Sequence, residues 1–427
     1  MVGPDSTFAP ALGRLWWPWL VGSLLCMWAP CAPAQARCPA QANWPAWASF
    51  REQFVSPDGR VVDPSSARRV TTSEGQAYSL FFALVAGDRD AFRLALEWTQ
   101  NNLADGDLRA RLPAWAWGHQ DDDSWRVLDT NAAADADLWM AYALGEAGRL
   151  WQEPGYLRLA RALASRILEQ ETAVVDGIGR VLFAGPVGFG PYDHAGVVRA
   201  KTNPSYLPLP VLRWLAQGAL GQQAQWRDVL GTSLRALKEG APKGLAADWL
   251  MATTASLDGP ARFVPTADEG LPDPDTADAK GVIAISQGEP TGSYNAIRVY
   301  LWLGLADAGD ADRSDLVARY APMAGLTADR GAPPEEVFPL DGRAQGEGPP
   351  GFSAALLPFL EALGRHDVAQ RQQERLVAEP LRTGAYYEQA LGLFALGHRD
   401  GFFRFDARGF LQPKWTHACA APASSTR

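Results

Sequence analysis

The amino-acid sequence predicts an all-α protein, a toroid of six helical hairpins or (α/α)6 barrel. Apolar residues recur at helical spacing in about twelve segments, and most of these follow one another in pairs separated by Gly, Pro or Asp. No repeat of fixed period is visible, which disfavours a solenoid. In such a toroid the inner helices begin at one face, where long loops are expected to build a cleft.

The predicted helices run from residue 44 almost to the end of the chain. They are expected at residues 44–55, 74–86, 88–103, 135–148, 154–171, 206–218, 225–239, 293–306, 312–323, 352–363, 368–378 and 384–397. Strand signals are few. Short β-hairpins are predicted only in loops, at 174–183 and 402–411, where glycines interrupt apolar residues.

One long segment, 255–290, lacks helical periodicity and is rich in Asp, Pro and Gly. Helical pattern resumes directly after it, so we interpret it as a loop inserted into a domain rather than a linker. A chain of 427 residues is long enough for one large core or for two ordinary domains. We predict a single domain over residues 37–427.

The amino terminus is predicted to be a cleavable secretory signal over residues 1–36. Arg14 precedes an apolar run at 15–29, and the small-residue site Ala34-Gln35-Ala36 follows it. The run is shorter than the ~20 residues of a membrane span, although a non-cleaved anchor remains the alternative. The mature protein is therefore expected in the periplasm or outside the cell, with no membrane segment of its own.

Cleavage of the signal would leave two cysteines, Cys38 and Cys419, near the two ends of the mature chain. In an oxidising compartment we expect them to form a disulfide, and two unrelated thiols are the alternative. Two cysteines and five scattered His residues give nothing that resembles a zinc ligand set, so no metal site is predicted.

The composition argues against two classes of function. A net charge of −9 disfavours nucleic-acid binding, which needs clustered Lys and Arg, and also disfavours a polybasic membrane-surface role. The chain contains seventeen Trp. Their rings stack well on flat apolar faces such as those of sugars, but Trp is also ordinary core material, and composition alone favours the core.

Glu74 is the first candidate for chemistry. In the segment Thr71-Thr72-Ser73-Glu74-Gly75-Gln76, Ser73 and Gln76 have the spacing of a capping box, which explains both without catalysis. The capping box does not account for Glu74, which lies in the first helical turn. It is either a surface carboxylate stabilised by the helix dipole or a general acid. A general acid would need apolar or like-charged surroundings that outweigh the dipole, and Tyr78, Trp115 or Trp117 could supply them.

Asp135 and Asp137 are the second candidates. They open the helix predicted at 135–148, where acids are common as N-cap or first-turn residues. At the mouth of an inner helix they would instead place carboxylates in a cleft. There a carboxylate could bind sugar hydroxyls and stabilise positive charge that develops at an anomeric carbon.

Both segments resemble motifs of one enzyme family. Residues 133–144 with the trailing Trp151 resemble the signature of glycoside hydrolase family 8, with Ala134 in place of the usual Ser or Thr, and residues 71–76 resemble its general-acid segment. The resemblance covers the mature chain and is closest to the periplasmic endo-β-1,4-glucanases associated with bacterial cellulose synthase. Five segments carry this closer match: 98–103 (WTQNNL), 203–208 (NPSYLP), 241–244 (APKG), 293–300 (SYNAIRVY) and 351–355 (GFSAA).

This resemblance implies an (α/α)6 barrel, endo-β-1,4-glucanase (cellulase) activity with inversion, and no cofactor. Glu74 falls on the position of the family's proton donor. Asp135 falls on its signature acid, which in an inverting mechanism stabilises charge at the −1 subsite rather than acting as a nucleophile. The further candidates for substrate binding are Trp115, Trp117, Asp137, Tyr206, Tyr294 and Arg298. For Tyr206, Tyr294 and Arg298, a place at the edge of the core or an ordinary buried ion pair is an equally good explanation.

Asn295 is a departure from the pattern. The branch usually has Ser-Tyr-Asp-Ala-Ile-Arg, in which the Asp is the general base. Loss of a positioned base typically costs ~10²–10⁴ in rate, because a neutral amide cannot take the proton. Three explanations are open: a base from the inserted loop, a slow or inactive protein that only binds glucan, or an altered residue in this sequence. The candidate bases in the loop are Glu289, Asp268, Glu269, Asp273, Asp275 and Asp278.

The sequence therefore predicts a monomeric, exported endo-β-1,4-glucanase whose substrate is a cellulose chain and whose candidate partner is the cellulose synthase complex. The first alternative is a glucan-binding component with weak or no hydrolytic activity. The second is another α/α-barrel enzyme such as a polysaccharide lyase, which would need a Tyr, His or Lys base beside a uronic acid.

Overall fold

The computed structural model describes residues 42–194, 196–255, 259–267 and 288–417, all within the compact unit Cys38–Arg427. The predicted signal, Cys38, Cys419 and the loop acids from Asp268 to Asp278 lie outside these ranges, so the predictions made for them stay untested. None of the helices within the described ranges is long and apolar enough to cross a membrane.

Six helices form an inner ring, as predicted for an (α/α)6 barrel. They are α2 (Ser73–Ala86), α4 (Ala134–Leu150), α6 (Leu209–Leu215), α8 (Ile297–Leu305), α11 (Pro350–Ala362) and α13 (Tyr386–Arg399). These helices are apolar on nearly all sides because ring neighbours cover them laterally and outer helices cover them from outside. Phe394 of α13 closes the ring, since its side chain lies 5.2 Å from the Phe81 ring of α2 and 5.0 Å from the Trp302 ring of α8.

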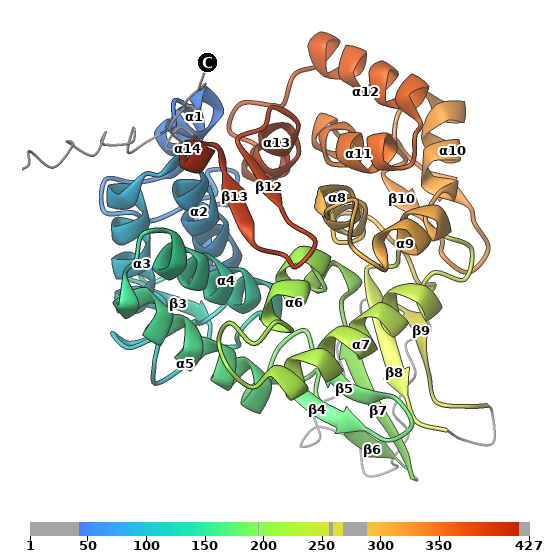
Figure 1. Cartoon of the computed structure of the whole chain (residues 1–427), viewed down its shortest axis with the longest axis horizontal. Coiled ribbons are helices and arrows are strands. Elements are labelled where there is room, and N and C mark those ends of the chain that lie inside the picture. Colours follow the sequence, from blue (N-terminus) through green and yellow to red (C-terminus); the bar gives the residue numbers. More distant parts are fainter. Residues whose placement is uncertain (1–41, 195, 256–258, 268–287, 418–427) are drawn as a thin grey trace, which may run out of the picture. The chain divides into compact units, whose positions relative to one another are not determined.

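The remaining larger helices pack outside this ring, most of them against an inner helix next to them in sequence, while α10 contacts the outer helix α12. They are α1 (Pro45–Phe54), α3 (Arg89–Leu103), α5 (Pro154–Gln170), α7 (Gln223–Glu239), α9 (Arg313–Arg319), α10 (Pro322–Arg330) and α12 (His366–Ala378). In Figure 1 the colours run once around the ring, and red α13 returns beside blue α1, which it contacts. The short helix α14 (Lys414–His417) ends the described chain.

Short antiparallel sheets fill the connections between helices. A three-stranded sheet contains β1 (Thr71–Thr72), β2 (Ala116–His119) and β3 (Trp125–Asp129), and a four-stranded sheet contains β6 (Tyr192–His194), β7 (Val197–Thr202), β8 (Trp249–Thr253) and β9 (Arg262–Thr266), each in chain order. Three hairpins complete the set: β4 (Thr172–Val175) with β5 (Gly179–Leu182), β10 (Glu336–Val337) with β11 (Ala344–Gln345), and β12 (Phe403–Phe405) with β13 (Leu411–Pro413). The first and last of these hairpins were predicted.

Several predicted boundaries are wrong where prolines interrupt the helical pattern. The helix predicted at 206–218 is a 3-10 turn, η1 (Pro204–Tyr206), followed by the shorter α6. The helix predicted at 312–323 ends at Arg319, and a new helix starts at Pro322. Proline lacks the N–H that a continuing helix needs and restricts the residue before it, which explains both breaks.

Two other predictions are also corrected. The inserted loop predicted at 255–290 contains β9, which pairs with β8 over five residue pairs and so extends a sheet. The helix predicted at 293–306 starts only at Ile297, because residues 293–296 form a turn. Strands of two to six residues, such as β1 and β7, give too short an alternation to be predicted from the sequence.

The first turns of α2, α4 and α8 meet at one face of the ring. Glu74, Asp135 and Arg298 lie in these turns, at the second residue of each helix. The barrel therefore brings together side chains that are far apart in the sequence, and this face carries the candidate site.

The close packing of α8 against α11 gives a testable prediction. A Cβ added at Gly304 of α8 would lie 2.4 Å from the backbone nitrogen of Phe359 in α11. We expect Gly304→Ala to lower the free energy of unfolding by about 1–3 kcal/mol, because the two helices must separate. Urea unfolding would measure this change.

Gly325→Ala in α10 is the matched control, since a Cβ there would meet nothing within 4 Å. It should leave stability unchanged or raise it by up to about 1 kcal/mol through helix propensity. Equal effects of the two substitutions would contradict the packing described.

Candidate active site

Arg298 is the centre of a buried polar cluster. Its Nη1 donates to Asp135 at 3.0 Å and to the Tyr78 hydroxyl at 3.1 Å, and it also donates to Glu74. Its Nη2 donates to Asn295 Oδ1 at 2.8 Å. We call Arg298 and these four partners the Arg298 cluster. Only 3% of Arg298 is exposed, so its charge is compensated by these neighbours rather than by water.

Glu74 lies at the mouth of α2, but not in the capping box predicted from the sequence. The N-cap is Thr72, whose hydroxyl accepts from Gly75 N at 3.1 Å. Gln76 points the other way, into the core, where its amide binds the backbone of Val61 at 2.6 Å. The capping-box prediction is therefore wrong, because long-range bonds take Gln76 away from the helix terminus. Glu74 keeps a partly exposed carboxylate that faces Arg298.

Asp135 is fully buried beside Glu74. Burial, followed by the charge of Glu74, raises the pKa of Asp135 to about 8, and Arg298 acts in the opposite direction. A hydrogen bond from Asp135 to Glu74 favours the protonated form further, while Asp135 Oδ1 also accepts from Ala136 N at 2.8 Å. The two carboxyls with one arginine therefore retain a proton at neutral pH.

Asp137 does not join the Arg298 cluster, although the sequence suggested that it could bind substrate. It is paired with Glu171, at the end of α5, and both side chains are completely buried. No donor from another described residue reaches their oxygens, so the two carboxyls bond by sharing a proton. Burial raises the pKa of both acids well above the usual range. Asp137 is inaccessible to a sugar and ties α4 to α5.

Asn295 occupies the turn before α8, where it accepts a hydrogen bond from Arg298. Tyr294, the preceding residue, is 46% exposed, and its ring lies 5.0 Å from that of Phe352 and 6.0 Å from that of Tyr387. Tyr387 donates its hydroxyl proton to the Tyr294 carbonyl. The turn thus presents an amide toward the cluster and an aromatic ring toward solvent.

A row of rings leads away from Arg298. The Tyr206 ring lies 5.6 Å from the Arg298 guanidinium and 6.5 Å from the ring of Trp249. Trp249 in turn stacks on Phe189 at 5.6 Å with an interplanar angle of 8°. The buried Lys201 places its Nζ 4.4 Å from the Trp249 ring centroid. Flat rings in series beside polar groups suit a chain of sugar rings.

A second aromatic group lies on the hairpin of β2 and β3, next to the start of α2. The Trp115 carbonyl accepts from Ser73 N at 2.9 Å, and 44% of Trp115 is exposed. Trp117 stacks on Trp125 at 5.3 Å, and the Arg60 guanidinium lies 4.5 Å from the Trp117 ring. The sequence-predicted Trp115 therefore borders the mouth of α2, whereas Trp117 is engaged by protein groups.

Glu289, the alternative base, does not reach the Arg298 cluster among the described residues. Its exposed carboxylate pairs with Arg343, which also binds Asp341 at 2.5 Å. The described part of the chain likewise contains no group of three or more His, Cys, Asp or Glu residues that could hold a metal ion.

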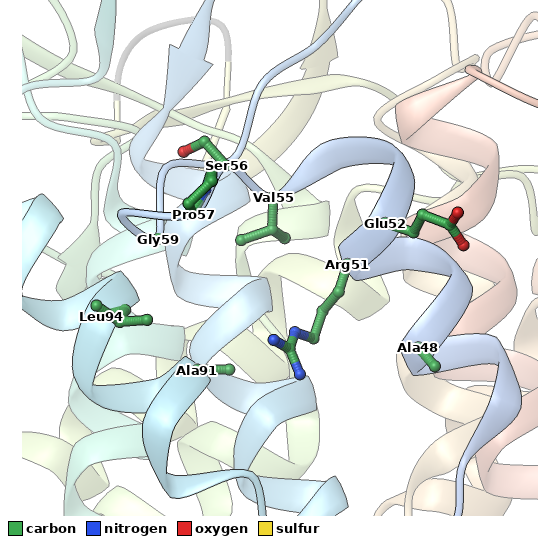
Figure 2. Close-up of a pocket in the computed structure, with 9 residues that line it drawn as sticks. All are labelled: Ala48, Arg51, Glu52, Val55, Ser56, Pro57, Gly59, Ala91 and Leu94. Atoms are coloured by element: carbon green, nitrogen blue, oxygen red, sulfur yellow. The ribbon is translucent and has the colours of Figure 1, made fainter.

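Figure 2 shows a pocket formed by α1, the loop after it and α3. None of its residues belongs to the Arg298 cluster, and its one arginine, Arg51, binds Asp88 at 2.7 Å. The pocket is a depression between helices and adds no chemistry to the site.

The chain matches a known enzyme family over most of its length. A model of the glycosyl hydrolases family 8 matches residues 25–267 and 264–401. The chain belongs to this family. Its members are glycoside hydrolases with an (α/α)6 barrel, so the predicted family, enzyme class and fold are confirmed, and the lyase alternative is excluded.

Relatives in the family match along most of their length. An endoglucanase of Salmonella typhi is 42% identical over 388 residues, which cover 91% of this chain and 94% of that protein. An endoglucanase of Xanthomonas axonopodis pv. citri (strain 306) is 40% identical over 395 residues, with the same coverage. The crystal structure of endo-1,4-D-glucanase from Vibrio fischeri ES114 has a TM-score of 0.72 and 38% identity, and covers 87% of this chain and 99% of that one.

Sequence reasoning missed several residues in the site and in its support. Tyr78 was considered only as a neighbour of Glu74, and no role was given to Glu171, Trp249 or Tyr387. Glu171 ends a helix without any motif, and Trp249 lies in a short strand. Their relation to the cluster depends on tertiary contacts, which the spacing of residues does not reveal.

The shared proton of Asp137 and Glu171 predicts a pH effect on stability. A carboxyl whose pKa rises on folding makes the folded state bind more protons than the unfolded chain, so stability falls as pH rises above about 4. For one proton the slope is about 1.4 kcal/mol per pH unit, until the folded group titrates. Glu171→Gln replaces the proton by an amide N–H, so its stability should fall less steeply between pH 6 and 9 than that of the wild type.

Urea unfolding at each pH would measure the slope. Asp310→Asn is the control, since it removes a buried carboxylate that binds Arg213 at 2.6 Å and should lower stability by a similar amount at every pH. The same slope for Glu171→Gln and the wild type would show that no proton is shared.

Proposed function

We propose that the protein is an endo-β-1,4-glucanase that hydrolyses cellulose chains with inversion, with Glu74 as its general acid. The observation that carries this proposal is the Arg298 cluster, which holds Glu74 beside Asp135 at the mouth of the inner helices. The relatives named endoglucanases, which match over nearly their whole length, support the choice of substrate.

The acid step needs a proton on Glu74 when the glycosidic oxygen departs. The Glu74–Asp135 pair retains a proton at neutral pH, because the pKa of Asp135 is about 8 and the two carboxyls are hydrogen-bonded. We propose that this proton passes to Glu74 and then to the departing oxygen. Asp135, left as a carboxylate against Arg298, then stabilises positive charge at the anomeric carbon.

The attacking water must also lose a proton for hydrolysis to proceed. Asn295 can orient a water molecule, but it cannot accept the water's proton at neutral pH. Glu289, the described candidate for an alternative base, is exposed and paired with Arg343. These observations favour a second candidate function, a glucan-binding protein with weak hydrolytic activity, and the two substitutions below distinguish the candidates.

We further propose that a glucan chain lies along the aromatic row of Tyr206, Trp249 and Phe189 and against the exposed Trp115 and Tyr294. Stacked rings supply apolar contact to sugar faces without specifying a reaction, so this part holds for either candidate function. The predicted signal over residues 1–36 supports a periplasmic or secreted location. The five segments that resemble the cellulose-synthase-associated branch support a role in cellulose synthesis, with the synthase complex as candidate partner.

Glu74→Gln tests the acid. We expect it to lower the release of reducing ends from carboxymethylcellulose by about 10²–10⁴, because the amide cannot donate the proton. Glu97→Gln is the matched control on α3, where the carboxylate is exposed and pairs with Arg93 at 2.9 Å, and it should leave activity unchanged. Full activity of Glu74→Gln would sink the assignment.

Asn295→Asp tests the water-activating position. A carboxylate at this position would face Arg298 at hydrogen-bonding distance and could accept a proton, so we expect kcat to rise by about 10²–10⁴. The same reducing-end assay would measure it. An unchanged kcat would contradict this expectation and would assign the base to another carboxylate, such as one in the loop at 255–290.

A further inference from the structure

The turn before α8 is held by a residue from a distant part of the chain. The N-cap of α8, Ala296, has no side-chain cap of its own. Instead, Asp248 Oδ1 accepts from Ser293 N at 2.9 Å and from Ala296 N at 2.7 Å. Asp248 lies 45 and 48 residues before these two amides, so its carboxylate caps the helix across the fold.

The backbone around Asp248 interlocks with the same turn. Asp248 N donates to the Thr291 carbonyl at 2.8 Å, and Gly292 N donates to the Val337 carbonyl at 2.9 Å. Gly292 also packs so closely that an added Cβ would lie 1.9 Å from the Ala246 carbonyl oxygen. The backbone just before the turn is therefore held on both sides by neighbouring segments.

Asn295 lies between the two amides that Asp248 holds. One helical turn later, Arg298 binds Asn295 with one nitrogen and Glu74 and Asp135 with the other. A shift of the turn would move Asn295 directly and would move the first turn of α8, which carries Arg298. A loss of the Asp248 contacts would therefore change the position of Arg298 and, through it, of Glu74 and Asp135.

We propose that Asp248 is a positioning residue for glycoside hydrolysis. Its carboxylate fixes the turn at residues 293–296 and thereby aims Asn295 and Arg298 toward the reacting sugar and water. The expected change in kcat rests on the proposed function. The expected loosening of the turn at residues 293–296 does not.

Asp248 lies near Asn295, so a role as the missing base is the competing explanation. Its Oδ1 already accepts two backbone N–H groups of the turn, which is the geometry of a cap. The two roles differ in what the side chain must supply. Positioning requires an oxygen that accepts hydrogen bonds, whereas proton transfer requires a carboxylate.

Two substitutions separate these roles. Asp248→Asn keeps an oxygen that can accept from Ser293 and Ala296, and we expect its kcat to stay within about threefold of the wild type, with an unchanged pH profile. Asp248→Ala removes the acceptor, and we expect kcat to fall by about 10–10², with a smaller change in KM, because small displacements of catalytic groups have effects of this size. Asp315→Ala, at an exposed acid that pairs with Lys238 at 3.0 Å, should leave kcat unchanged.

Amide hydrogen exchange supplies a readout that needs no activity. Asp248→Ala should speed the exchange of the amides of residues 293 and 296, while Asp248→Asn should leave it close to the wild type. Unchanged exchange in Asp248→Ala would overturn the proposal, whether or not the wild type is active. An inactive wild type with faster exchange in Asp248→Ala would instead overturn only the proposed function. Equal loss of kcat in both variants, with a lost limb of the pH profile, would also overturn it in favour of a base.

Discussion

The candidate site depends on one buried positive charge, the guanidinium of Arg298. Removing such a group from water costs several kcal/mol, which is recovered only through good hydrogen bonds and nearby opposite charges, and here both terminal nitrogens of Arg298 have partners. These partners come from α2, α4 and the turn before α8, so satisfying Arg298 also fixes where three inner helices begin. The same contacts place Glu74 close enough to Asp135 for its charge to raise the pKa of the Asp135 carboxyl.

Other buried or capping acids stabilise the elements around Arg298 in different ways. The paired acids Asp137 and Glu171 lie in the interior and join two helices, whereas Asp248 acts from a loop and holds the turn that carries Asn295. Each acid therefore has a different role, which is set by its partner rather than by its residue type. The neutral side chain of Asn295 is the point at which this site departs from complete acid–base chemistry.

Much of the fold could be predicted because it is local. Inner helices such as α2 and α4 have long apolar runs with clear breaks, and Glu74 and Asp135 stand in motifs that a single sequence displays. The errors arose where tertiary contacts overrode local pattern. Gln76 binds the backbone of Val61 in the core instead of capping α2. The helix expected from residue 293 is preceded by a turn, which is held by Asp248. Partners such as Glu171 could not be predicted, because only the closed ring brings them together.

The most direct test of this account is the crystal structure of the Glu74→Gln variant with a bound cello-oligosaccharide. The account predicts that a glycosidic oxygen lies within hydrogen-bonding distance of the side chain at position 74, with the adjoining sugar ring beside Asp135 and a water molecule bound by Asn295. A sugar chain bound at another face, or one that crosses the ring with its glycosidic oxygens remote from position 74, would contradict it.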